Sequence, residues 1–174
     1  RTARELVIML AEQGLVYAEI RFAPQLHTRK GMTQAEAIEA VIEGVNEGMK
    51  QAKTIDIGII CCTMSIGLET VNKEENLETV RATKQYLGKG VVALDLAGAE
   101  GIVPLKNFGY IFDLARELEL PITVHAGDSD GPQTAWDALE FGTKRIGHGH
   151  RVYDDKELIK KCIEDNVTLE ICPT

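Results

Sequence analysis

The sequence predicts an α/β protein built on a parallel sheet. Six short runs of apolar and β-branched residues alternate with longer stretches of helical periodicity. These runs are nearly continuous in apolar character, which is typical of parallel strands that helices cover. The predicted strands span residues 15–22, 55–62, 91–97, 122–125, 145–148 and 167–172.

The spacing of these strands predicts a barrel. Dividing 174 residues by six gives 29 residues per strand-helix unit, close to the ~31 of a barrel of about 250 residues with eight units. We therefore expect an incomplete (β/α)8 TIM barrel that holds strands two to seven and lacks the first and eighth. The start without methionine and the end at Thr174 agree with this expectation. A doubly wound open sheet is the alternative, but the glycine-rich turn typical of that fold is absent after the first strand.

Four helices are predicted most clearly. The helix at 33–52 begins with Thr33 and Glu36 in capping-box spacing. A second helix is expected at 107–118, and a third from Pro132 to about Gly142. The last is expected to begin around Asp154.

Composition restricts the class of partner. The chain has 19 Lys plus Arg against 27 Asp plus Glu, a net charge of −8, and its basic residues are scattered. This pattern disfavours nucleic acid and membrane surfaces and favours small molecules. No apolar run approaches the roughly 18 to 20 residues of a membrane span and no signal peptide is recognisable, so we expect a cytoplasmic protein of one domain. The four cysteines form no C-x-x-C pair and are expected to be buried core thiols.

Polar residues gather where the predicted strands end. Asp95, His125, His148 and Glu170 all lie at or near such ends, where barrels place their active sites. Small residues flank both histidines and allow a ligand to approach closely. Two histidines that end adjacent strands predict one shared site for a substrate or a metal.

Other polar residues have structural interpretations. Glu19 and Arg21 alternate onto one face of the first predicted strand, where we expect them to pair inside the barrel. Glu100 is expected to be solvated. His150 is as easily explained as a surface residue of a loop as a member of the site.

Five motifs resemble those of the adenosine deaminase family in order and spacing. They are EIRFAP at 19–24, DLAGAE at 95–100, HAGD at 125–128, GHGH at 147–150 and EICPT at 170–174. The resemblance covers essentially the whole chain and implies that residues 1–174 are part of an adenosine deaminase catalytic barrel domain.

The resemblance also implies a zinc site. The family holds one Zn2+ ion by two histidines on the first strand, one histidine ending the fifth and an aspartate ending the eighth. By position, His125 matches the fifth-strand metal ligand, and His148 matches the residue that orients and helps activate the attacking water. Gly98 matches a glycine whose backbone N–H binds the purine. Asp128 lies where the family usually has a glutamate that donates a proton to purine N1.

The implied activity is zinc-dependent hydrolytic deamination of adenosine, a purine nucleoside, to inosine and ammonia. The other zinc deaminase signature, H-x-E followed by P-C-x-x-C, is absent from the sequence. Two departures from the family pattern matter. The other metal ligands are missing, so we expect the chain alone to bind zinc negligibly and to be inactive. Asp128 is also one methylene, ~1.5 Å, shorter than glutamate. Asp130, two residues further on, is an alternative donor, although the helix start at Gly131 and Pro132 favours Asp128.

Four alternatives remain open. Adenine or another 6-aminopurine is an alternative substrate, and a non-catalytic purine-binding relative would explain Asp128. A barrel hydrolase acting on amides or esters is disfavoured because DLAGAE and GHGH occur together. AMP would require a cluster of Arg or Lys at the strand ends, where the sequence has few.

Overall fold

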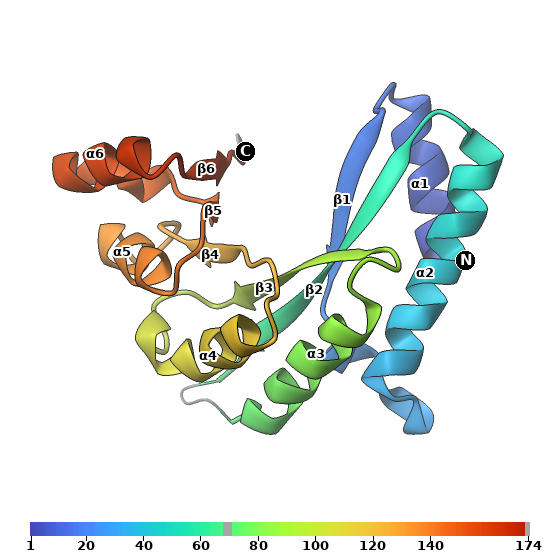
Figure 1. The fold of residues 1–174 in the computed structure, drawn as a ribbon, viewed down its shortest axis with the longest axis horizontal. Helices are drawn as coiled ribbons and strands as arrows, with labels where there is room; N and C mark the ends of the chain where they lie inside the picture. Colours follow the sequence, from blue (N-terminus) through green and yellow to red (C-terminus); the bar gives the residue numbers. More distant parts are fainter. Residues whose placement is uncertain (68–70, 173–174) are drawn as a thin grey trace.

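The computed structural model describes residues 1–67 and 71–172. Parallel strands form an open arc, and the helices pack on its outer side (Figure 1). The strands are β1 (Tyr17–Phe22), β2 (Asp56–Ser65), β3 (Val91–Gly98), β4 (Val124–Ala126), β5 (Arg145–His148) and β6 (Thr168–Glu170). The α-helices are α1 (Thr2–Glu12), α2 (Gln34–Ala52), α3 (Lys73–Tyr86), α4 (Gly109–Glu117), α5 (Pro132–Glu140) and α6 (Lys156–Glu164). Short 3-10 helices are η1 (Pro24–His27), η2 (Arg29–Gly31), η3 (Leu105–Phe108) and η4 (His150–Asp154).

The strands follow one another in space in the order in which they occur in the chain. β1, β2 and β3 form one parallel group, and β4, β5 and β6 form another. A bridge between Leu94 and Ile122 joins the two groups, with the Thr123 N–H donating to the Leu94 carbonyl at 2.9 Å. A doubly wound sheet reverses its strand order, whereas a barrel does not. The sequential order therefore confirms the predicted incomplete barrel.

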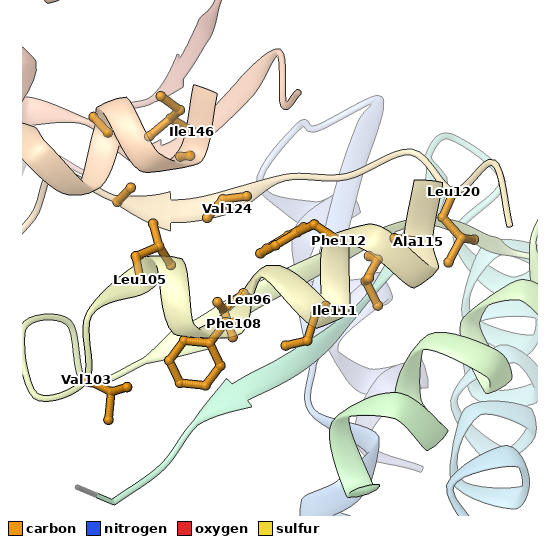
Figure 2. Close-up of a cluster of buried hydrophobic side chains, with 14 of the residues drawn as sticks. Leu96, Val103, Leu105, Phe108, Ile111, Phe112, Ala115, Leu120, Val124 and Ile146 are labelled. Carbon is orange, nitrogen blue, oxygen red and sulfur yellow. The ribbon is translucent and has the colours of Figure 1, made fainter. Parts of the chain in front are cut away.

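Two hydrophobic clusters hold the helices against the arc. The first lies between β1 and β2 and helices α1 to α3, with Ile38, Val45 and Ile59 among its buried members. The second lies between β3 to β5 and helices α4 to α6 (Figure 2), where Phe108 and Phe112 are each 1% exposed. Because each strand contributes to a cluster, the strand ends have fixed positions relative to one another.

All six predicted strands are present, with boundaries shifted by at most three residues; β2, for example, continues to Ser65 instead of ending at Cys62. The capping box is confirmed, because Thr33 Oγ1 accepts the Glu36 N–H and Glu36 accepts the Thr33 N–H. Helix α5 begins at Pro132 as predicted, and Asp155 caps the N-terminus of α6. Helix α1 was not among the predicted elements.

The cysteines are unpaired, and the prediction of buried thiols is correct for three of them. Cys61, Cys62 and Cys162 are buried, whereas Cys172 is exposed because it follows β6 at the open edge of the arc. Burial raises the pKa of the Cys61 thiol to about 12. Among the helices that the structure describes, none combines the length and hydropathy needed to cross a membrane.

Candidate active site

His125 lies on β4 with its ring against the buried carboxylate of Asp95 on β3. The His125 Nδ1 atom is 3.1 Å from Asp95 Oδ1 and 2.9 Å from Oδ2, and the Asp95 side chain is 0% exposed. A carboxylate at Nδ1 places the ring proton on that nitrogen, which leaves the Nε2 lone pair free. This arrangement is typical of histidines that bind a metal through Nε2.

Arg21, on β1, balances the charge of Asp95. Its Nη1 atom is 3.1 Å from Asp95 Oδ2, and its Nη2 atom is 2.5 Å from Glu170 Oε2. Burial alone would lower the pKa of the guanidinium, but Asp95 and Glu170 raise this pKa above its ordinary value, so Arg21 is charged. Nη1 is also 3.4 and 3.2 Å from the two ring nitrogens of His125. These nearly equal distances show that Nη1 does not lie along the Nε2 lone pair.

The charged network continues around the inside of the arc. Arg145 Nε lies 3.0 Å from Glu170 Oε1, and Arg145 Nη1 lies 2.6 Å from Glu19 Oε2. Glu19 and Arg21 therefore share one face of β1 as predicted, but the expectation that they pair with each other is wrong. Glu19 pairs with Arg145 on β5, and Arg21 pairs with Asp95 on β3 and Glu170 on β6. Residues two apart on a strand point in the same direction, so both side chains extend into the inside of the arc and meet oppositely charged groups of other strands.

His148 ends β5 next to His125. The centroids of the two rings are 5.2 Å apart in an edge-on arrangement. His148 has a φ of 64°, a left-handed conformation that costs a non-glycine residue about 1–3 kcal/mol. Its neighbour Gly147 lies under the His125 ring, where an added Cβ would be 3.1 Å from Cγ. The backbone of His148 therefore has an unfavourable conformation at the point where its ring lies beside that of His125.

Asp128 lies in the loop after β4 and faces two histidines. Its Oδ1 atom is 4.0 Å from His148 Nδ1 and 3.6 Å from His150 Nδ1, and its side chain is 45% exposed. His150 therefore lies beside the site, although the sequence left this open. The GHGH motif was the sequence signal that could have placed His150 here, because only Gly149 separates it from His148. His150 begins η4 directly after that glycine.

Gly98 ends β3 and has a φ of 133°, a conformation that favours glycine. An added Cβ at this position would overlap the carbonyl oxygen of Ser65 on β2. Gly98 and His125 line the same pocket, whose walls also include Ser65, Phe108 and Thr134. The glycine predicted to contact a substrate and the histidine predicted to bind a metal therefore face a common space.

Glu100 is only partly exposed and its carboxylate is bound by the neighbouring loop, whereas the sequence-based expectation was a solvated side chain. Its Oε2 atom accepts the backbone N–H groups of Asp128 at 2.9 Å, Ser129, and Asp130 at 3.2 Å. Its Oε1 atom accepts the Thr134 hydroxyl at 2.6 Å. The expectation failed because these donors come from a loop 28 or more residues away along the chain.

The site can offer a metal only part of a coordination shell. Within residues 1–67 and 71–172, no three His, Cys, Asp or Glu side chains are grouped so that they could hold a metal ion. His125 nevertheless has the carboxylate partner and the free Nε2 of a metal ligand. Pro173 and Thr174, the end of the EICPT motif, lie outside the described residues.

We expect Asp95→Asn to lower the free energy of unfolding by about 2–4 kcal/mol, because it leaves Arg21 and His125 without a buried negative partner. Guanidinium unfolding measures this loss. Asp113→Asn is the matched control, since Asp113 pairs with Arg116 on the surface of α4, with both side chains more than 60% exposed. Its loss should stay below about 1 kcal/mol. Equal losses in the two variants would contradict the role given to Asp95.

Comparison with known proteins agrees with this geometry. A sequence profile described as Adenosine deaminase matches residues 1–174. An adenosine deaminase of Haemophilus ducreyi is 43% identical over 172 residues, covering 97% of this chain and 49% of that protein. The chain spans about half the length of the curated relatives it matches.

Solved structures resemble the fold closely. The N6-methyl-AMP deaminase of Arabidopsis thaliana superposes with a TM-score of 0.83 and 26% identity, over 98% of this chain and 50% of that one. A zinc-bound amidohydrolase of Burkholderia ambifaria superposes with a TM-score of 0.87 over 97% and 46% of the two chains. At 20% identity, the second likeness concerns the fold alone. With the profile match over its whole length and the order of its strands, this chain belongs to the adenosine deaminase family.

Proposed function

We propose that the protein containing this chain deaminates adenosine hydrolytically to inosine and ammonia. One observation carries the proposal: at the ends of adjacent strands, His125 is held by Asp95 and lies next to His148, which in turn faces Asp128. A metal ligand, a base and an acid are the groups that hydrolysis of a C–N bond needs. Membership of the adenosine deaminase family supports the bond between purine C6 and its amino nitrogen as the one that is broken.

The cofactor we propose is one zinc ion with His125 Nε2 among its ligands. Zinc lowers the pKa of a bound water to roughly 7 and so would make a nucleophile available at neutral pH. A catalytic zinc generally has three protein ligands or more. We therefore infer that further ligands come from chain outside these 174 residues, in agreement with relatives of about twice this length.

The residues at the strand ends have distinct proposed tasks. His148 orients the attacking water and accepts its proton as oxygen bonds to purine C6. The electrons of the C6–N1 bond move to N1, which takes a proton from Asp128. The amino group then takes the proton that His148 accepted and leaves as ammonia, while the hydroxyl on C6 returns a proton to the Asp128 carboxylate and becomes the carbonyl of inosine. The backbone N–H of Gly98 binds the purine ring and fixes its orientation.

Asp128 is a better candidate for the proton donor than Asp130. The carboxyl group of Asp128 faces His148 and His150. The side chain of Asp130 instead packs over Gly101, where an added Cβ would be 3.1 Å from Asp130 Cγ. The Asp130 side chain therefore lies against the loop that follows β3.

The substrate we propose is an uncharged purine nucleoside. The chain has a net charge of −8, and the arginines inside the arc, Arg21 and Arg145, are already paired with carboxylates. The charge of each is therefore already balanced by a carboxylate, whereas a phosphate group is bound best by an unpaired arginine. We also propose a cytoplasmic location, which unpaired cysteines support because disulfides are rare in that compartment.

Replacing Asp128 with asparagine should lower kcat in the complete deaminase by about 10²-fold or more, because proton donation to N1 is lost while the size of the side chain is kept. The change in ultraviolet absorbance as adenosine becomes inosine measures this rate. Asp56→Asn, at the opposite end of β2, is the control and should leave kcat unchanged. An unaltered kcat in Asp128→Asn would refute the assignment.

The 174-residue chain alone should bind zinc negligibly and show no turnover, because it provides one proposed ligand where a catalytic site needs at least three. Metal analysis after gel filtration gives the zinc content, and the same absorbance assay gives the activity. Stoichiometric zinc together with measurable deamination would show that the ligand assignment is wrong.

A further inference from the structure

Glu100 connects the loop that follows β3 to the loop that follows β4. Its carboxylate accepts three consecutive backbone N–H groups, those of Asp128, Ser129 and Asp130. It also accepts the hydroxyl of Thr134 at 2.6 Å, and that hydroxyl accepts the Gly127 N–H at 2.8 Å. The whole segment 127–130 is thus fixed, directly or through Thr134, to one side chain of the other loop.

The charge of Glu100 suits this position. Burial alone would raise the pKa of Glu100, but the hydrogen bonds from Thr134 and from the backbone at 128–130 lower it below its ordinary value. The carboxylate also lies at the first turn of α5, where the helix dipole stabilises negative charge. An ionised acceptor makes stronger hydrogen bonds than a neutral one.

The two connected loops carry the two proposed purine contacts. Gly98 precedes Glu100 by two residues and is held from the other side by its close packing against Ser65. Asp128 is itself one of the residues whose N–H Glu100 accepts. We propose that Glu100 is a positioning residue that sets the distance between Gly98 and Asp128, and so places the proton donor at N1 of a purine bound through Gly98.

This inference rests on the proposed function and explains how an aspartate serves where the family usually has a glutamate. A short side chain has few rotamers with which to correct a misplaced backbone, so the position of the loop decides where the carboxyl group lies. A displacement of about 1 Å can cost about 10²-fold in rate. Glu100 should therefore affect kcat through Asp128, without touching the substrate.

A double-mutant cycle in the complete zinc-loaded deaminase tests this role. Glu100→Gln removes the charge and one acceptor atom and should lower kcat by about 10²-fold, with KM and zinc content nearly unchanged. In the Asp128→Asn background the same substitution should cost less than about threefold, because the group that Glu100 positions no longer donates a proton. Glu78→Gln, an exposed carboxylate on α3, is the matched control and should leave kcat unchanged.

The outcomes separate the two hypotheses. Equal losses on Glu100→Gln in both backgrounds would overturn the positioning role and leave Asp128 as the donor. An unchanged kcat in Asp128→Asn would reject the proposed donor, and with it the positioning role.

Amide hydrogen exchange gives a readout independent of activity. In Glu100→Gln, the amides of residues 128–130 should exchange at least about tenfold faster, while those of β2 stay protected. Should Glu100→Gln not fold, Thr134→Val provides a second variant, because it removes the hydroxyl that Glu100 accepts but keeps the shape of the side chain. Thr134→Val should lower kcat and Thr134→Ser should retain it; equal rates in the two variants would overturn the proposal.

Discussion

The buried carboxylate of Asp95 constrains the rest of the site. A charge without exposed surface is tolerated only when opposite charge and hydrogen bonds surround it, and here Arg21 and His125 both contact it within about 3 Å. Arg21 must in turn reach Glu170, so strands β1, β3, β4 and β6 are joined through their side chains as well as through the sheet. The orientation of His125 follows from this network, because its Nδ1 atom faces Asp95.

The loops after β3, β4 and β5 extend this network of fixed side chains beyond the sheet. Glu100 fixes the loop that carries Asp128, and the left-handed conformation of His148 turns its ring toward His125. Unfavourable backbone geometry at a strand end persists only where the surrounding structure determines it. The buried cluster under α4 and α5 provides this support, since Val124, Ala126 and Ile146 are each 0% exposed directly beneath the loops.

The arc formed by the described residues is open at both edges, which are strands β1 and β6. Tyr17 on β1 and Ile171 after β6 are 54% and 81% exposed, and the apolar side chains of Tyr153 and Ile163 are exposed beside the second edge. Open edges and exposed apolar side chains are unfavourable in water and are features that a complete barrel covers. The relatives, about twice as long as this chain, have the additional length that such closure requires.

The sequence alone determined the six strands, the capped start of α2 and the positions of His125 and His148 at strand ends, because periodicity and capping are local properties of the chain. Only the tertiary structure decided which charges meet. The pairing of Arg21 with Asp95 and Glu170 joins residues 74 and 149 positions apart, and the role of Glu100 depends on backbone donors 28 to 30 residues away. Hydrogen bonds and ion pairs require proximity in space, which the curvature of the sheet and the packing of its helices establish, and which no local pattern encodes.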